Sequence, residues 1–294
     1  MSDVQGYCDE SFEEVRHLFQ TYIDSGEELG ASLYVTINGT PVVDIYGGYK
    51  DETLTELWRE DTIANVFSTS KAICALAALT LVDRGMIDVN AKVSKYWPEF
   101  AQNGKEKIEV RHILSHTSGV SGWESPMSKM DMYNFEESVQ KLAEQKPWWE
   151  AGTASGYHSL TFGFLIGELV RRVTGKTLKG FIADELATPA SADFQLGVRD
   201  NDIRRTSHIV PYLTTPSAMS SSEPDSTSIA FKSFSNPQVK VEMANTPAWR
   251  EAEIGAANGH ANARGVGRIL SAIALSGNVD GTQVLSRETI DLIF

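Results

Sequence analysis

A serine and a lysine stand three positions apart at Ser68 and Lys71, in the stretch VFSTSKAICALAAL at residues 66–79. On a helix such residues lie one turn apart on the same face, so the two side chains can meet. A serine hydroxyl needs a base within hydrogen-bond reach before it becomes a useful nucleophile. Burial in the apolar run that begins at Ala72 would lower the lysine pKa and provide that base. We interpret the pair as a candidate nucleophile and base.

The same spacing occurs again at Ser138 and Lys141, in the stretch FEESVQKLAEQ. This segment is charged and amphipathic, so its lysine is expected to be solvated and protonated. Spacing alone therefore does not identify a catalytic pair. The apolar surroundings of Lys71 favour the first pair over the second.

The elements that would position the first pair are mainly helical. Residues 68–84 are apolar on all sides and Gly85 suits a C-terminal cap, which indicates a helix buried inside a domain. A second, largely apolar helix is predicted at 160–173, closed by Gly175. Further helices are expected at 11–25, at 261–275 and from Ser286 onward.

Strand signals are concentrated near the N-terminus. Apolar and polar residues alternate between 32 and 45 on both sides of Asn38-Gly39, a favoured two-residue turn, which predicts a β-hairpin. Asn38-Gly39-Thr40 is also a glycosylation sequon, but the turn interpretation is favoured because we find no secretion signal. Residues 211–237 are rich in Ser, Pro and Thr and predict a long exposed excursion.

Composition limits the class of protein. The chain has 294 residues, 41% of them hydrophobic, and a formal net charge of -13, which disfavours binding to nucleic acid or to anionic membranes. It has two cysteines, Cys8 and Cys74, which argues against a disulfide framework and fits a reducing compartment. The N-terminus lacks a signal peptide pattern and no apolar run reaches the length of a membrane span. We expect a cytoplasmic protein.

Several stretches together resemble one enzyme superfamily. After the Ser68 segment come LVDRGMIDVNAKVSKYWPEF, VRHILSHTSGV, PWWEAGTASGYHSLTFGFLIGELVRRVTG and GAANGHANARGVGRILSAI, in this order. They resemble the serine β-lactamase and penicillin-binding protein superfamily, whose motifs include Ser-x-x-Lys. More narrowly they are similar to its carboxylesterase branch, with family VIII esterases, fungal statin-type acyltransferases and animal β-lactamase-like proteins. The match covers most of the chain from residue 30 to residue 294.

The resemblance implies an α/β fold in which an antiparallel sheet is flanked by helices and a mainly helical region, with the active site between them. It implies that Ser68 is the acyl-accepting nucleophile, Lys71 its general base or proton relay, and Tyr157 the second acid/base group. A phenol near an ammonium can release a proton and return it to the leaving group. Substrate-binding roles are expected for Ser159, Gly259 and His260, and no metal or organic cofactor is required.

Two departures from the family pattern stand out. The usual Tyr-x-Asn is here Tyr157-His158-Ser159, and serine has no NH₂ donor, so β-lactam hydrolysis is expected to be weak at most. Ser159 is alternatively the N-cap of the following helix. The third motif, Lys-Thr-Gly or a His/Trp-Gly-Gly variant on a strand, is not found. We therefore expect either a truncated copy or another segment that completes a sheet begun by the two-stranded hairpin.

Other chemistries were weighed against this interpretation. His112 and His116 have the spacing of zinc ligands, but HILSH lacks the glutamate of His-Glu-x-x-His, and a hydrogen-bonding histidine is favoured. Residues 174–177, TGKT, follow a helix and lack the first glycine of a phosphate loop. Aromatic residues are candidates for an acyl pocket, although core or rim packing is the commoner role: Trp123, Tyr133, Trp148 and Trp149.

We predict a single β-lactamase-like domain over residues 1–294, with a sheet part at about 28–62 and a helical part with Ser68 and Tyr157 at about 63–205. A flexible excursion at about 206–246 and helices at about 247–294 complete it. The predicted function is a serine carboxylesterase that forms an acyl-Ser68 intermediate on small-molecule esters, lactones or acyl thioesters. An acyltransferase with the same intermediate and a catalytically weak binding or assembly protein remain alternatives, and the sequence leaves the oligomeric state open.

Overall fold

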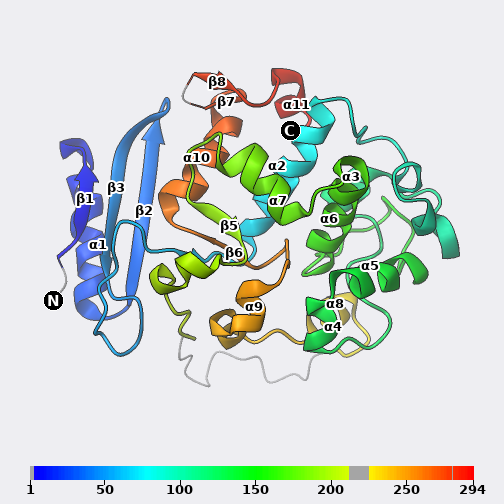
Figure 1. Ribbon diagram of the computed structural model, residues 1–294, viewed down its shortest axis with the longest axis horizontal. Helices are drawn as coiled ribbons and strands as arrows, with labels where there is room; N and C mark the ends of the chain where they lie inside the picture. The colour runs from blue at the N-terminus through cyan, green and yellow to red at the C-terminus, as the bar shows by residue number, and fades with distance from the viewer. Residues whose placement is uncertain (1–2, 212–224, 280) are drawn as a thin grey trace.

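The computed structural model describes residues 3–211, 225–279 and 281–294. In these parts an N-terminal sheet lies beside a larger helical body, with α10 next to the sheet (Figure 1). The helices are α1 (Glu13–Ser25), α2 (Thr69–Asp83), α3 (Val110–Leu114), α4 (Lys129–Tyr133), α5 (Phe135–Glu144), α6 (Thr161–Thr174), α7 (Leu178–Ile182), α8 (Ile229–Ser235), α9 (Pro247–Glu251), α10 (Ala263–Ala274) and α11 (Arg287–Asp291). The strands are β1 (Gln5–Cys8), β2 (Gly30–Ile37), β3 (Thr40–Gly48), β4 (Ala64–Asn65), β5 (Phe194–Leu196), β6 (Gly259–Ala261), β7 (Asn278–Val279) and β8 (Thr282–Gln283).

The predicted hairpin is confirmed as β2 and β3, but the N-terminal sheet has three antiparallel strands in the order β1-β3-β2. Asn38 and Gly39 both have positive φ, 51° and 81°, as the tight turn requires. The third strand, β1, was not predicted from the sequence. β1 pairs closely with β3: a Cβ on Gly6 would lie 2.2 Å from the Asp44 carbonyl oxygen.

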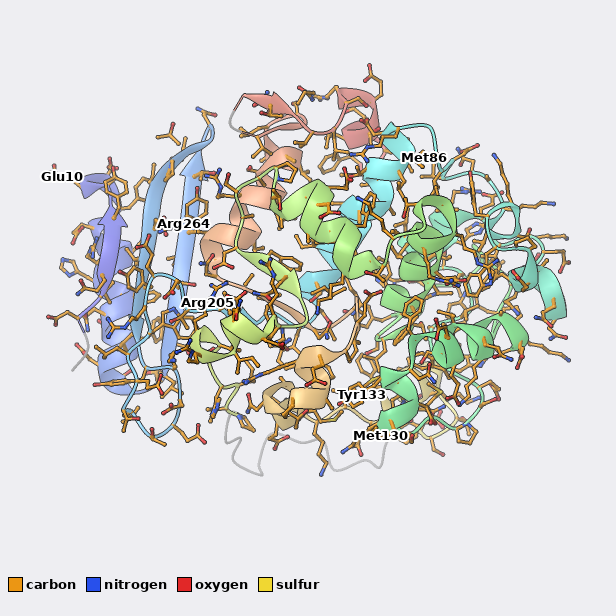
Figure 2. The ribbon with its side chains drawn as sticks, in the orientation of Figure 1. Glu10, Met86, Met130, Tyr133, Arg205 and Arg264 are labelled. Carbon is orange, nitrogen blue, oxygen red and sulfur yellow. The ribbon has the colours of Figure 1, made fainter. Side chains whose placement is uncertain are left out.

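Helices cover both faces of this sheet. α1 packs on β3, because a Cβ on Gly48 would lie 3.0 Å from the Ile23 side chain. On the opposite face α10 contacts β2, where Gly267 leaves room for the ring of Tyr34. Arg264 reaches from α10 to the sheet (Figure 2), and its Nε lies 2.5 Å from an oxygen of Asp44. The sheet is thereby joined to the helical body.

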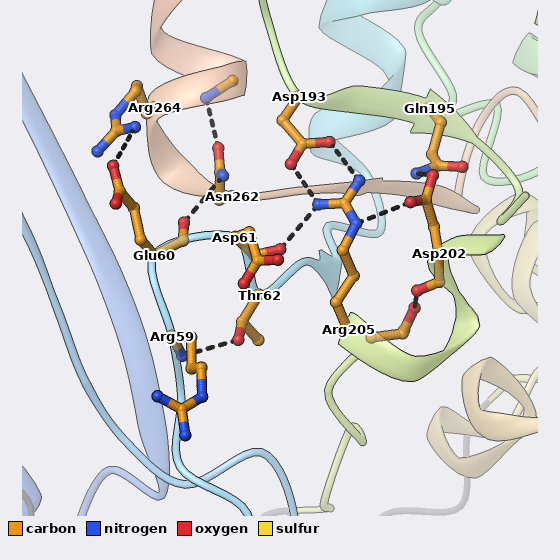
Figure 3. A network of polar contacts seen from close by, with 12 residues as sticks. Arg59, Glu60, Asp61, Thr62, Asp193, Gln195, Asp202, Arg205, Asn262 and Arg264 are labelled. Carbon is orange, nitrogen blue, oxygen red and sulfur yellow. Dashed lines mark hydrogen bonds and ion pairs between the residues drawn. The ribbon is translucent and has the colours of Figure 1, made fainter.

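A network centred on Arg205 holds the connection that leads from the sheet to Ser68 (Figure 3). The Arg205 guanidinium binds both oxygens of Asp193 and donates to Asp202 Oδ1 at 2.8 Å. It also donates to the backbone oxygen of Asp61 at 2.7 Å, three residues before β4. These carboxylates raise the pKa of Arg205, so the charged form is stabilised. The network fixes the chain entering the site.

The core of the body is built around α2, most of which is buried as predicted, although Ala72 is exposed. α2 packs on α6, also largely apolar, and α6 ends at Gly175 with φ 73° as expected. Gly163 of α6 lies against the Gly255–Ala256 backbone, so a Cβ there would come within 2.3 Å of the Ala256 nitrogen. None of the helices described is long and apolar enough to cross a membrane.

The Ser, Pro and Thr-rich excursion is only partly described. Residues 212–224 lie outside the described residues. The part that follows is helical, because it contains α8 and a 3₁₀ turn at Val241–Asn245, and Ser228 caps α8 by accepting from the Phe231 N–H. The sequence did not predict this helix, and most residues of α8 are exposed, as expected for an excursion. The other predicted helices are confirmed as α1, α10 and α11.

Candidate active site

Ser68 lies directly before α2 with an exposed side chain. A short sheet in the order β4-β6-β5 holds this position, since Val66 N–H donates to the Gly259 carbonyl at 2.8 Å. Gly259 N–H in turn donates to Ser70 Oγ at 2.9 Å. Phe67 has φ 41°, a region that few residues with side chains adopt. The chain is thus turned sharply at the residue before the hydroxyl.

Lys71 points back at Ser68, as its spacing predicted. Its Nζ lies 3.2 Å from Ser68 Oγ and donates to two backbone carbonyls, Ser159 at 2.7 Å and Ala256 at 2.9 Å. The residue is only 7% exposed, and burial lowers the pKa of Lys71 from its ordinary value. The hydrogen bond with Tyr157 opposes this shift. A buried amine beside a serine hydroxyl is equipped to accept its proton.

Tyr157 faces the same hydroxyl from the loop before α6. Its OH donates to Ser68 Oγ at 2.8 Å, and Lys71 Nζ lies 4.8 Å from the centre of its ring. The side chain is 39% exposed, so a leaving group can reach the phenol. The structure therefore brings together the three residues proposed as catalytic, from two segments 86 positions apart along the chain.

Two histidines hold the loop that carries Tyr157. His116 Nδ1 accepts from the His158 backbone N–H at 3.1 Å, and the His116 ring lies 4.9 Å from the Tyr157 ring. His158 Nδ1 donates to the Gly156 carbonyl, so its Nε2 accepts from Ser118 Oγ at 2.6 Å. Burial lowers the pKa of His116, and lowers that of His158 to about 3. Both rings are therefore neutral acceptors.

Three residues were expected to bind substrate: Ser159, Gly259 and His260. The first uses its backbone carbonyl, and the other two are buried in the protein interior. Ser159 accepts from Lys71 through its carbonyl, and the N-cap prediction is wrong because α6 takes Leu160 as its N-cap without a side-chain bond. Gly259 is buried against Ser70. His260 is completely buried, and burial lowers its pKa to about 4. Neither of these two presents a surface to a ligand.

The aromatic candidates fall into different roles. Trp123 is 2% exposed and donates to the Ser138 carbonyl at 3.0 Å, so the pocket assignment is wrong for this residue: it is a core side chain. Trp149 is half-buried, donates to the Thr117 carbonyl and packs against Gly156, next to Tyr157. Trp148 donates to Glu124, and Tyr133 lies on α4 (Figure 2).

The competing motifs have structural explanations. His112 Nδ1 accepts from the Glu109 N–H at the start of α3, and no cluster of three or more potential metal-ligating side chains occurs among the described residues. In TGKT, Gly175 caps α6 and Thr177 caps α7, so the segment joins two helices. His116 is confirmed as a hydrogen-bonding residue near the site.

Three features beside Ser68, Lys71 and Tyr157 were not predicted from the sequence: the Ala256 carbonyl, the contact of His116 with Tyr157, and the contact of Phe234 with Tyr157. Phe234 of α8 is 57% exposed and its ring stacks on Tyr157 at 6.0 Å. A carbonyl has no residue-type signal because every residue carries one. Phe234 lies inside the Ser, Pro and Thr-rich stretch at 211–237, where no periodic pattern pointed to a site.

A sequence model for one family, described as beta-lactamase, matches residues 15–292. The chain belongs to the beta-lactamase family. The esterase/beta-lactamase LipL of Mycobacterium tuberculosis (strain ATCC 25618 / H37Rv) is 34% identical over 294 residues, covering 98% of this chain and 68% of LipL. This confirms the predicted superfamily.

Solved structures agree with the family assignment. The structure of a family VIII carboxylesterase matches with a TM-score of 0.89 and 36% identity, covering 98% of this chain and 76% of that one. The structure of a penicillin-binding protein homologue from Caulobacter crescentus matches with a TM-score of 0.88 and 34% identity, with the same coverage of 98% and 76%. The predicted fold class, of β-lactamase type, is thereby confirmed.

Proposed function

We propose that the protein is a serine carboxylesterase that cleaves small-molecule esters through an acyl-enzyme on Ser68. One observation carries this proposal: the exposed Ser68 hydroxyl is within hydrogen-bond reach of both Lys71 Nζ, at 3.2 Å, and the Tyr157 hydroxyl, at 2.8 Å. A nucleophile, a base and a second proton carrier thus meet at a point that a substrate can reach. Similarity to LipL and to a family VIII carboxylesterase supports esters as the substrate class.

The hydrogen bonds indicate how the proton moves. A neutral lysine amine has two N–H groups and one lone pair, and the Ser159 and Ala256 carbonyls accept the two N–H groups. The lone pair is then left for the third neighbour, Ser68 Oγ. As Oγ bonds to the carbonyl carbon of the ester, the Ser68 O–H bond breaks and its proton passes to Lys71 Nζ.

The leaving group departs with help from Tyr157. When the tetrahedral intermediate collapses, the bond between the carbonyl carbon and the alcohol oxygen breaks, and the Tyr157 hydroxyl gives that oxygen a proton. Lys71, whose Nζ lies 4.8 Å from the Tyr157 ring centre, returns a proton to the phenolate. Water attacks the acyl-Ser68 ester and loses a proton by the reverse route. Atoms and protons balance over the cycle.

The choice between esters and β-lactams follows from position 159. Ser159 offers its carbonyl to Lys71 and has no amide group to hold the amide of a β-lactam. We propose that nitrocefin is turned over far more slowly than a simple ester. The carboxylesterase and acyl-transfer routes share the same acyl-enzyme, and exposure of Ser68 favours water as the acceptor.

The test is the intact mass of the protein after exposure to p-nitrophenyl acetate and, separately, to a fluorophosphonate, with the modified residue mapped. We expect ester turnover and an adduct on Ser68. Ser68→Ala should lose the adduct and lower kcat by about 10⁴-fold or more. Ser138→Ala, in the second serine-lysine pair, should retain both. Turnover that survives in Ser68→Ala would refute the mechanism, and no adduct on the wild type would favour a binding or assembly protein.

The compartment and partners are part of the proposal. Cys8 and Cys74 are both free thiols, and Cys74 is buried, with Sγ 2.8 Å from the Gly255 carbonyl oxygen. Together with a net charge of -13, this supports a cytoplasmic enzyme that acts on small molecules and does not bind nucleic acid or anionic membranes.

A further inference from the structure

Helix α8 is fixed beside the site by one buried and two partly buried polar contacts. Ser233 is 4% exposed, and its Oγ lies 2.8 Å from the Oγ of Ser121. At the end of the helix, the Asn236 amide donates to the Trp123 carbonyl at 2.8 Å and accepts from the Met127 N–H at 2.7 Å. Hydrogen bonds of this kind hold a helix in one position. α8 is therefore held in a defined position next to the site.

The face of α8 next to Tyr157 is apolar. The Cγ2 atom of Ile229 lies 3.2 Å from the point where a Cβ on Gly156 would stand, one residue before Tyr157. The Phe234 ring stacks on the Tyr157 ring with centres 6.0 Å apart and planes 22° apart. One face of the site is thus lined by hydrocarbon that extends outward from the catalytic phenol.

Phe234 nevertheless remains 57% exposed. Its ring stacks on that of Tyr157, which is 39% exposed, and the Tyr157 hydroxyl lies 2.8 Å from the Oγ of the exposed Ser68. Single exposed apolar residues are common on protein surfaces. A ring stacked on Tyr157 and held by the buried Ser233 differs from these, because Tyr157 connects it to the Ser68 hydroxyl.

We propose that Phe234 is the specificity-determining wall against which the acyl chain of the substrate packs. The inference rests on the proposed esterase function and names its substrate class: esters whose acyl group is apolar and several carbons long. An acetyl group is too short to cross from Ser68 past Tyr157, whereas an octanoyl group covers the ring. Each methylene that leaves water against Phe234 should raise kcat/KM by up to about fourfold.

The chain supplies a matched control on the same helix. Phe231 is the same residue type and 36% exposed, but the ring contacts of Tyr157 among the described residues are with His116 and Phe234. At 100° per residue, Phe231 is turned 60° from Phe234, further from the buried side that Ser233 marks. Truncating it removes a similar apolar surface that does not face the site.

The experiment compares p-nitrophenyl acetate, butyrate, hexanoate and octanoate with the wild type, Phe234→Ala, Phe234→Leu and Phe231→Ala. The leaving group is constant, so the octanoate-to-acetate ratio of kcat/KM reports the acyl chain alone. We expect Phe234→Ala to lower this ratio about tenfold, Phe234→Leu to lower it less, and Phe231→Ala to leave it within about twofold. Fluorophosphonate labelling of Ser68 at the wild-type rate shows that each variant is folded with an intact site.

The outcomes separate the inference from the function on which it rests. An unchanged ratio in Phe234→Ala overturns the inference and leaves the esterase proposal standing, as does an equal fall in Phe231→Ala. An equal loss on acetate and octanoate also overturns it, because Phe234 would then act only by supporting Tyr157. If the wild type neither turns over any ester nor labels on Ser68, the proposed function fails and the inference fails with it.

Discussion

Two serine-lysine pairs with the same spacing stand in this protein in opposite environments. Lys71 is 7% exposed and its Nζ is held by two carbonyls and Ser68 Oγ. Lys141 of α5 has a side chain 23% exposed and forms an ion pair with Glu137 at 3.0 Å. Accordingly burial lowers the pKa of Lys71, and the hydrogen bond and charge of Glu137 raise the pKa of Lys141.

The two serines differ as much as the lysines. Ser68 is exposed and accepts from Tyr157, whereas Ser138 is fully buried and donates to the Asp131 carbonyl at 3.0 Å. One hydroxyl is open to a substrate and the other completes a buried hydrogen bond. The comparison shows that a catalytic pair needs a buried amine and a hydroxyl that a substrate can reach. Helical spacing only brings the two side chains close together.

The largest expected effect comes from removing the two amines separately. Lys71→Met should lower kcat on p-nitrophenyl acetate by about 10³-fold, because general-base catalysis contributes effects of this size. Lys141→Met should change kcat by less than about twofold. Steady-state kinetics on both variants measure the contrast. Comparable losses in the two variants would mean that the environments do not distinguish the pairs.

A smaller effect is expected from disturbing Tyr157, which has no counterpart beside Ser138 and Lys141. His116→Ala removes the acceptor of the His158 N–H and the ring beside Tyr157. Misplacement of the phenol should lower kcat about tenfold with little change in KM. His112→Ala is the control: it loses the bond from the Glu109 N–H at the start of α3, which should cost about 1 kcal/mol of stability and leave kcat unchanged. If His112→Ala has the larger effect on kcat, His116 is not a positioning residue.

The smallest effect concerns stability against pH, where the two lysines should have opposite signs. The pKa of Lys71 is lowered in the folded protein, so the folded state binds fewer protons than the unfolded state between that pKa and the ordinary value of 10.5. Burial of charged Lys71 therefore lowers the free energy of unfolding at low pH, and this destabilisation is relieved as pH rises through this window. The raised pKa of Lys141 gives a favourable term that is present below 10.5 and is lost as pH rises above it.

Chemical unfolding between pH 7 and pH 10 measures this difference. The unfolding free energy of the wild type minus that of Lys71→Met should rise with pH. The same difference taken with Lys141→Met should stay flat over this range and amount to less than about 1 kcal/mol, because the pair is at the surface. A difference for Lys71→Met that falls with pH would contradict a buried, tuned amine.

The residues of the first pair could be predicted because burial is encoded in the sequence around them. The apolar run after Lys71 signalled a helix without a solvent face, and the charged run around Lys141 signalled the reverse. The hairpin turn at Asn38-Gly39 and the cap at Gly175 were predictable because positive φ selects few residue types. Tyr157 was found through the family resemblance and not through its own spacing.

Other features could not be predicted for physical reasons. β1 is four residues long and is held mainly by backbone pairing with β3, so its side chains carry little signal. Trp123 and Phe234 are both large aromatic residues, and residue type does not reveal which is buried and which faces the site. The carbonyls of Ser159 and Ala256 orient Lys71, yet their positions depend on how α6 and the 255–258 turn pack.

That packing depends on the absence of a side chain at Gly163 of α6. Gly163 has no chemistry of its own, yet the space left by its missing methyl group is filled by the Ala256 backbone, whose carbonyl holds the Lys71 amine. The inner surface of α6 thus positions the Ala256 carbonyl, which in turn positions the Lys71 amine. Substitutions where α6 packs on the Gly255–Ala256 backbone can therefore change the basicity of Lys71 without changing any residue that contacts the substrate.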